Sequence, residues 1–145
     1  MLPRWHIFLG ALFTLAIWLP FPSINPLFPI LVFLSSFLID FDHYLASVNK
    51  TDKLSLKNSF EYHRKAGIQE RREHKLGIRK KSDFHLFHTI EFHILIGLIG
   101  IFIAPFFFIF LGMIFHSMLD LFDLSRRGML YRREYFFFNW LKQRL

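Results

Sequence analysis

Four apolar segments dominate this sequence, and charged stretches follow the second and the fourth of them. The apolar segments cover residues 5–19, 23–40, 84–104 and 106–124. A helix needs about 20 mainly apolar residues to cross a bilayer. With 53% hydrophobic residues and 21 Phe in 145 residues, the chain is also more apolar than an ordinary soluble domain. We therefore predict an all-α integral membrane bundle of about four transmembrane helices, a single domain over residues 1–145.

The positions of Lys and Arg predict the orientation of this bundle. Basic residues gather in residues 41–83 and 129–145, and Arg4 precedes the first apolar segment. Because Lys and Arg near the ends of spans stay on the cytoplasmic side, four spans place both termini and the 41–83 segment in the cytoplasm. We expect residues 41–83 to be a water-exposed loop, either a solvated, partly mobile connector or short amphipathic helices lying on the headgroups. The aromatic and basic tail, 129–145, is typical of an interfacial helix.

Composition also excludes several classes of function. The formal charge of +7 is compatible with nucleic-acid binding, but the sequence contains neither a binding motif nor a basic groove pattern. We therefore expect membrane lipid as the partner, and no nucleic acid. The chain has no Cys, so disulfides, thiolate zinc sites and thiol chemistry are excluded.

Three of the apolar segments carry acidic and histidine residues at one end. Ionisable side chains in apolar segments cost roughly 2.5 to 3.5 kcal/mol each on insertion scales, so they usually mark a functional site. The four-span topology brings all three clusters to the cytoplasmic boundary of the membrane. They are Asp40-Phe41-Asp42-His43, His85-Leu86-Phe87-His88-Thr89-Ile90-Glu91 and His116-Ser117-Met118-Leu119-Asp120.

Helical spacing predicts which of these side chains can meet. His88 and Glu91 are three residues apart and His116 and Asp120 are four apart, so each pair would share a helix face. Asp40 and His43 share a face as well if their helix continues. His85 lies one turn before His88 and could add a ligand, whereas His93 falls off that face and is expected to support the site structurally.

These residue types favour a metal site. No Lys or Arg lies in the helices at the level of Glu91 and Asp120, so their ionised carboxylates need a nearby cation or hydrogen bonds. A bound divalent metal is the partner we favour; neutral carboxyl groups or His–carboxylate pairs are the alternative. Mixed His and carboxylate ligands suit zinc, manganese or iron. The candidate metal ligands are Asp40, Asp42, His43, His88, His116 and Asp120, with Glu91 and His85 as further candidates.

The surplus of ligands favours catalysis. A closed tetrahedral zinc site needs only four ligands, so the candidates would suffice for two metal ions. Paired metals activate water and hold the leaving oxygen in phosphoester cleavage, with a spare carboxylate as base. Glu91 and Asp42 are our candidates for this catalytic role. At the headgroup layer the substrate would be a phospholipid or another amphipathic phosphoester.

The three clusters resemble a known family. Phe37-Leu38-Ile39-Asp40-Phe41-Asp42-His43, Phe87-His88-Thr89-Ile90-Glu91-Phe92-His93 and Gly112-Met113-Ile114-Phe115-His116-Ser117-Met118-Leu119-Asp120 are similar to segments of small inner-membrane metal-dependent hydrolases. That family carries a proline-aspartate-x-aspartate-histidine motif, paired histidines and a final histidine-x-x-x-aspartate, and more distantly it is similar to the zinc phospholipase C fold. Here Ile39 replaces the usual proline, and the residues after His88 also differ. The resemblance implies metal roles for Asp40, Asp42, His43, His88, His116 and Asp120, and zinc is the metal that we expect.

Three functions follow as hypotheses. The first is a membrane-embedded, metal-dependent hydrolase acting on a phosphoester or lipid-like substrate at the cytoplasmic face. The second is a di-iron redox protein, although such bundles carry Glu-x-x-His on two helices and this chain has only the reversed spacing His88-x-x-Glu91. The third is a non-enzymatic membrane protein with a structural metal site; transport is disfavoured because residues 94–110 carry no polar path to the other face.

Overall fold

The computed structural model describes residues 3–145 and confirms the all-α prediction, because those residues contain no strand. Single turns of 3-10 helix, η1 and η2, precede α5 and follow α6. The elements are α1 (Pro3–Trp18), α2 (Leu27–Leu38), α3 (Phe41–Thr51), α4 (Leu56–Lys75), η1 (Leu86–His88), α5 (Ile90–Phe102), α6 (Ala104–Arg126), η2 (Leu130–Arg132) and α7 (Phe137–Lys142).

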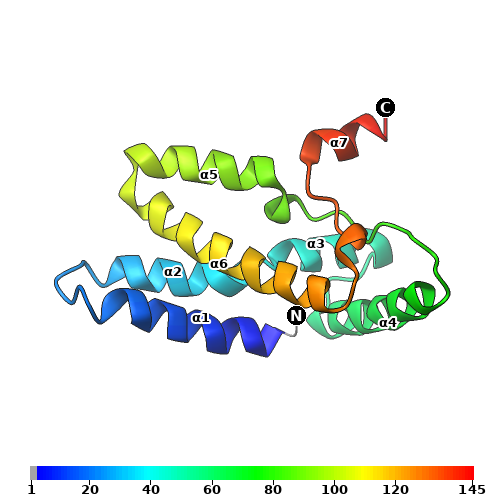
Figure 1. Cartoon of the computed structure of the whole chain (residues 1–145), viewed down its shortest axis with the longest axis horizontal. Coiled ribbons are helices and arrows are strands. Elements are labelled where there is room, and N and C mark those ends of the chain that lie inside the picture. The colour runs from blue at the N-terminus through cyan, green and yellow to red at the C-terminus, as the bar shows by residue number, and fades with distance from the viewer. Residues whose placement is uncertain (1–2) are drawn as a thin grey trace.

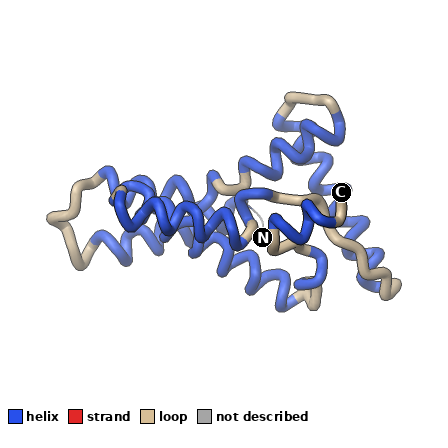
Figure 2. Tube along the Cα trace, turned by 90° about the horizontal axis from the view of Figure 1, so that it is seen from above, coloured by secondary structure: helices blue, strands red, loops and turns tan. Residues whose placement is uncertain are grey.

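Two helical hairpins form an elongated bundle (Figures 1 and 2). One hairpin is α1 with α2, and the other is α5 with α6; both turns lie at the same end of the molecule (Figure 1). The helix α6 lies at the centre and contacts α1, α2 and α5. The opposite end holds α3, α4, α7 and the start of α1. The ends of α2 and α6 and the start of α5 therefore meet at the polar end of the bundle.

Small residues let the helices of the bundle approach closely. A Cβ atom added at Gly112 of α6 would clash with Ser35 Oγ and with the Val32 carbonyl oxygen of α2. A Cβ atom at Gly10 of α1 would clash with Ser36 Oγ. Close approach at small residues is a common packing mode of membrane helices. It fixes the position of α2 between α1 and α6, next to the candidate site.

The charged segment 41–83, which we expected to be either a solvated connector or short amphipathic helices, contains the helices α3 and α4. Its many Lys, Arg, Glu and Gln residues are good helix formers, and charge alone does not distinguish a polar helix from a loop. Side chains one turn apart add support, as between Glu61 and Lys65, whose charged atoms lie 2.9 Å apart. Residues 52–55 separate the two helices, and residues 76–85 connect α4 to η1 without helical structure.

The third apolar segment begins its main helix later than predicted. Thr89 is extended, with φ −82° and ψ 150°, and its side-chain Oγ1 accepts a hydrogen bond from the Phe92 N–H. This is an N-cap, so α5 starts at Ile90 rather than at residue 84. His88 therefore precedes the helix that carries Glu91, and the predicted shared helix face of these two residues is wrong.

Two helical stretches within residues 3–145 are long and apolar enough to cross a membrane. They are Leu27–Thr51, in which α2 continues into α3 through a bend, and Ala104–Arg126. The apolar helix α5 is shorter, so this criterion selects two helices and not the four that we predicted. The side chains of Leu98, Ile101 and Phe102 on α5 are 54%, 71% and 86% exposed. Contiguous apolar surface of this kind marks contact with lipid or with a partner.

Candidate metal centre

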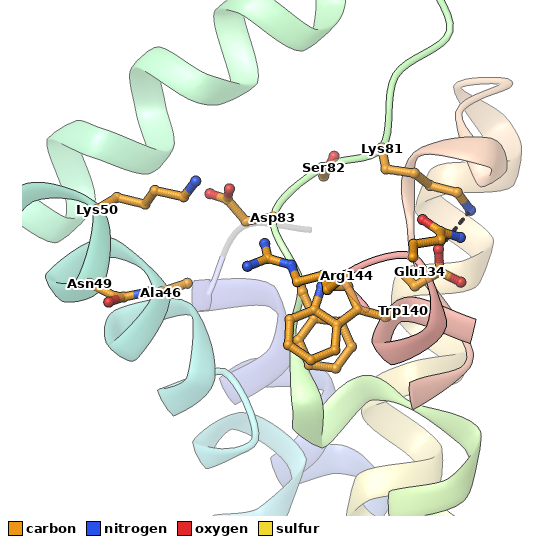
Figure 3. Close-up of a pocket in the computed structure, with 11 residues that line it drawn as sticks. Ala46, Asn49, Lys50, Lys81, Ser82, Asp83, Glu134, Trp140 and Arg144 are labelled. Atoms are coloured by element: carbon orange, nitrogen blue, oxygen red, sulfur yellow. Dashed lines mark ion pairs between the residues drawn. The ribbon is translucent and has the colours of Figure 1, made fainter. Parts of the chain in front are cut away.

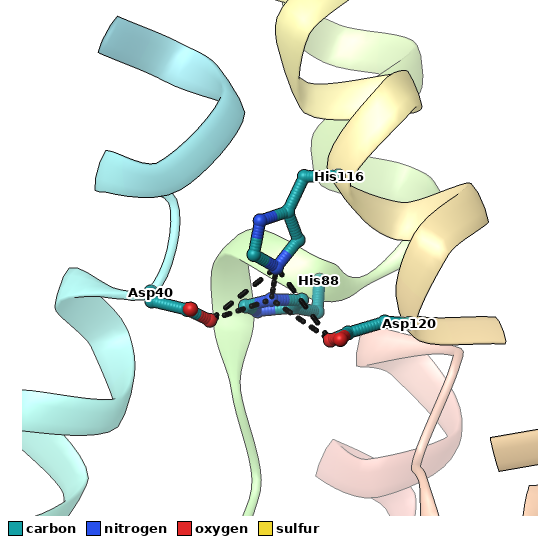
Figure 4. A group of neighbouring side chains, drawn as sticks. All are labelled: Asp40, His88, His116 and Asp120. Carbon is teal, nitrogen blue, oxygen red and sulfur yellow. Dashed lines mark hydrogen bonds and ion pairs between the residues drawn. The ribbon is translucent and has the colours of Figure 1, made fainter. Parts of the chain in front are cut away.

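Four side chains from three separate segments meet at the polar end of the bundle (Figure 4). Asp40 lies at the bend between α2 and α3, His88 ends η1, and His116 and Asp120 lie one turn apart on α6. We call these four residues the His–Asp cluster. One ligand atom from each lies within 4.8 Å of all the others, so the cluster could hold a metal ion.

The distances within the cluster have the scale of a coordination sphere. The two imidazole Nε2 atoms of His88 and His116 are 3.2 Å apart. Asp40 Oδ1 lies 3.5 Å from the first and 3.3 Å from the second. Asp120 Oδ2 lies 4.0 Å and 3.5 Å from the same two atoms. Metal–ligand bonds of about 2.0 to 2.2 Å in a tetrahedron separate the ligand atoms by roughly 3.3 to 3.6 Å. Three of the five separations lie in this range, and the 3.2 Å and 4.0 Å separations lie just outside it, so small side-chain movements would accommodate a divalent ion.

The other nitrogen of each ring determines its tautomer. His116 Nδ1 is 2.9 Å from the Ser36 carbonyl oxygen, which can only accept, so this nitrogen donates. His88 Nδ1 likewise donates to Asp42 Oδ2 at 3.0 Å. In the neutral rings both Nε2 atoms are then unprotonated and face each other beside two carboxylates. A cation or an additional proton must lie between them, and metal-binding histidines show this same pattern of outer hydrogen bonds.

The cluster is closed on most sides and open at Asp40. The side chains of His88 and His116 are fully buried and that of Asp120 is 6% exposed, whereas that of Asp40 is 27% exposed. The buried carboxylate of Asp120 requires compensating charge or hydrogen bonds, which a metal ion or neighbouring basic groups can supply. Water can reach the cluster from the Asp40 side.

Asp42, His43 and His85 lie beside the cluster. Asp42 Oδ2 also accepts a hydrogen bond from the Phe87 N–H at 2.9 Å. Its Oδ1 lies 3.7 Å from His85 Nδ1. The His85 ring stacks on His43, with centroids 3.7 Å apart, and His43 Nε2 lies 3.4 Å from Asp40 Oδ1. Asp42, His43 and His88 form a second group that could hold a metal ion, and it shares His88 with the His–Asp cluster.

Burial and nearby carboxylates set the protonation of the histidines on the connection before α5. Burial lowers the pKa of His85 to about 4, although Asp42 partly opposes this effect. His85 is therefore neutral at pH 7. Burial also opposes protonation of His88, but its hydrogen bonds to Asp40 and Asp42 outweigh that effect and raise its pKa.

Sequence reasoning missed two residues of this site. His6 of α1 is buried, its Nε2 lies 3.1 Å from Asp120 Oδ1, and its ring stacks on His116 with centroids 3.9 Å apart. Arg133, which follows η2, places its Nη2 2.5 Å from Asp120 Oδ2. We had considered only Lys and Arg of the helices as charge partners of Asp120, whereas this guanidinium comes from the tail. A lone His in an apolar helix was the available signal for His6; Arg133 had none.

Glu91 and His93 lie outside both groups that could hold a metal. The Glu91 carboxylate accepts hydrogen bonds from the Phe137 and Phe138 N–H groups, at 2.9 and 3.4 Å, and so holds the start of α7. His93 Nδ1 donates to the Thr89 carbonyl at 2.8 Å, and its Nε2 accepts from Ser117 Oγ at 3.0 Å. These contacts connect α5 to α7 and to α6.

Two cavities flank this end of the molecule. A polar one of about 620 Å³ lies between α3, the connection before η1 and the C-terminal segment, and Lys50, Lys81 and Arg144 line it with Asp83 and Glu134 (Figure 3). An apolar one of about 610 Å³ lies between α5 and α6 and reaches His88 and Arg133.

Searches of protein-family models, curated proteins and solved structures found no match to this chain. The site is therefore defined by the geometry of its own residues.

Proposed function

We propose that this chain is a membrane-embedded hydrolase that uses a divalent metal to cleave a phosphoester of a lipid or another amphipathic molecule at the cytoplasmic face. One observation carries the proposal: two imidazole nitrogens with fixed tautomers converge with Asp40 and Asp120 at a single point. Such a point is suited to a metal ion. The resemblance of the three sequence clusters to inner-membrane metal-dependent hydrolases supports the same reading.

The residues of the site would have different roles in the reaction. A divalent metal, when bound, supplies Lewis-acid polarisation of the phosphoryl group and a more acidic water. Asp40 is the most exposed member of the cluster and is placed to accept a proton from water that enters on its side. Asp42 keeps the His88 ring oriented through its hydrogen bond. Arg133 places a guanidinium, a good ligand for phosphate oxygens, at the inner side of the cluster.

This division changes the roles that the sequence predicted. Asp42 and Glu91 were our candidates for proton transfer. Asp42 Oδ2 accepts hydrogen bonds from His88 and Phe87, and Glu91 accepts two backbone hydrogen bonds from the start of α7. We propose Asp40 as the proton acceptor instead. Zinc is the metal that we expect, with manganese and iron as the alternatives.

The exposed apolar surface of α5 and the lengths of two apolar helical stretches support a location in a membrane. Two helical stretches can cross a bilayer, and the outward side chains of α5 are large and apolar. The polar end of the molecule carries α4 with its many Lys and Arg residues, and such basic segments are retained in the cytoplasm. The His–Asp cluster would then lie near the headgroups of the inner leaflet, where a phosphoester lipid presents its reactive bond.

Metal analysis and hydrolysis assays on the same preparation test the proposal. Detergent-purified protein should contain stoichiometric transition metal, and His88→Ala and Asp120→Ala should lose most of it. His74→Ala is the matched control, because His74 lies on α4 and contacts Tyr131. Wild type should hydrolyse a phosphoester, a chelator should abolish this activity, and added metal should restore it. Absence of metal from wild type would refute the proposal; bound metal without hydrolysis of any phosphoester would favour a structural metal site.

A further inference from the structure

An apolar groove runs along the bundle between α5 and α6. Its volume is about 610 Å³, and its walls are almost entirely hydrophobic. The two helices diverge from their shared turn toward the polar end of the molecule (Figure 1). Gly97 packs closely against Phe110 in this wall, because a Cβ atom added at Gly97 would lie 3.2 Å from the Phe110 ring. The main lining residues are Ile94, Leu98, Ile101, Phe107, Phe110 and Ile114.

The length of the groove matches one leaflet of a bilayer. Its lining on α5 extends from Ile90 to Ile101. At 1.5 Å per residue, this stretch is roughly 16 Å long. Half of a hydrocarbon core of about 30 Å is roughly 15 Å. A hydrocarbon chain from the inner leaflet could therefore lie in the groove along its full length.

The polar end of the groove borders the candidate metal centre. His88 and Arg133 line the groove, and Arg133 is its only Lys, Arg, Asp or Glu. The guanidinium of Arg133 is paired with Asp120 Oδ2. A divalent ion would balance the charges of Asp40 and Asp120 and leave this guanidinium available to a phosphate oxygen. A groove with one cation at its inner end is complementary to an anionic head on an apolar chain.

We infer that the α5–α6 groove binds the hydrocarbon chain of a long-chain phosphate ester and presents its phosphate to Arg133 and the His–Asp cluster. The inference rests on the proposed function and adds to it the place where the hydrocarbon chain of the substrate binds. The metal centre would thus receive water on the Asp40 side and the lipid on the Arg133 side.

Photo-crosslinking tests this inference without relying on turnover. The probe is a hexadecylphosphonate with a diazirine near the chain end, whose carbon–phosphorus bond resists phosphoester hydrolysis. The comparison probe is hexadecanol with the same diazirine. In metal-loaded wild type, the phosphonate should label residues of α5 and α6 about tenfold more strongly than the alcohol, because its anionic head can form charge-assisted hydrogen bonds with Arg133.

Matched variants distinguish binding of the probe in the groove from labelling at any lipid-exposed surface. Ile94→Trp should fill the groove and lower labelling about tenfold. Leu95→Trp is the control, because Leu95 is 52% exposed, close to the 55% of Ile94, and does not line the groove. Arg133→Gln should remove the preference for the phosphonate but keep labelling by the alcohol.

The outcomes distinguish this inference from the proposed function. Equal labelling by the two probes in wild type, or equal loss in Ile94→Trp and Leu95→Trp, would overturn the groove assignment. In that case hydrolysis of the soluble ester 4-nitrophenyl phosphate would still support a metal-dependent hydrolase. Phosphonate-selective labelling in a protein without metal-dependent hydrolysis would support the groove and contradict the proposed function.

Discussion

At the scale of single residues, the hydrogen bonds on the outer nitrogens decide what the inner nitrogens can do. The Ser36 carbonyl and the Asp42 carboxylate accept hydrogen bonds from the Nδ1–H groups of His116 and His88. The Nε2 lone pairs are thereby directed at one point. Asp42 thus acts through His88, while its Oδ1 lies near His85.

The orienting role of Asp42 gives the first prediction. In Asp42→Asn the cluster keeps all four ligands but His88 loses its carboxylate partner, so metal affinity should fall about 10- to 100-fold with unchanged stoichiometry at saturating metal. Competition with a metal-sensitive dye measures both quantities. Asp83→Asn is the control, because Asp83 bonds Tyr62 away from the cluster. Complete loss of binding in Asp42→Asn would instead identify Asp42 as a direct ligand, and an unchanged affinity would exclude both roles.

Glu91 provides the second prediction. Its carboxylate holds the N–H groups at the start of α7, so Glu91→Gln should leave metal content unchanged but increase hydrogen exchange at Phe137 and Phe138. The exposed surface pair of Glu61 with Lys65 serves for comparison, and Glu61→Gln should change neither quantity. A loss of metal in Glu91→Gln would restore the sequence-based hypothesis that Glu91 is a ligand.

At the scale of the helices, glycine contacts determine how closely the bundle packs. Gly112 faces the backbone of α2, with no space for a Cβ atom. Gly112→Ala should therefore destabilise the fold by about 1 to 3 kcal/mol, as overpacking does. Gly67→Ala in α4 should stabilise by about 0.5 to 1 kcal/mol, because the nearest atom to the new Cβ would be Arg71 Nη1 at 3.7 Å. Thermal unfolding in detergent measures both; a stabilised Gly112→Ala variant would contradict the described packing of α2 and α6.

Local spacing predicted the part of the site that lies within one helix. His116 and Asp120 are four residues apart in a continuous apolar run, and both reach the cluster from α6. Hydropathy and charge placed Asp40 and His88 at the same end of the bundle. The pairing of His88 with Glu91 failed because Thr89 interrupts the helix between them. A capping threonine can be recognised in a sequence, but the apolar residues on both sides of Thr89 led us to predict one continuous helix.

Residues that arrive from distant segments had no local signal. Arg133 reaches Asp120 because the chain reverses after α6. Gly128 adopts φ +64°, the Gly128 N–H bonds the Ser125 carbonyl, and the Met129 N–H bonds the Leu124 carbonyl. This is the Schellman ending of a helix. The glycine alone indicates a helix end, but the direction of the following segment depends on tertiary packing.

At the scale of the whole molecule, polar and apolar features are segregated along the long axis. The hairpin turns lie toward one end, and α3, α4 and α7 lie toward the other (Figure 1). The exposed residues Leu98, Ile101 and Phe102 belong to the part of α5 that leads to its turn, whereas the residues of the His–Asp cluster lie after α2, before α5 and on α6. The two cavities also differ, since the apolar groove follows the helices whereas the polar cavity lies among Lys50, Lys81 and Arg144. This segregation is the arrangement expected for a protein whose charged end faces water at one side of a bilayer.

The natural absence of cysteine makes this orientation directly testable. Ser23 is exposed in the α1–α2 turn, and Lys80 is exposed in the connection before η1 at the other end. We expect a membrane-impermeant maleimide to label Ser23→Cys in intact cells and Lys80→Cys only after the membrane is opened, because the basic segment is retained inside. Unmodified wild type is the background control. Labelling of Lys80→Cys alone in intact cells would indicate the opposite orientation. Labelling of both variants in intact cells would contradict a membrane-spanning arrangement, on which the access of lipid to the groove depends.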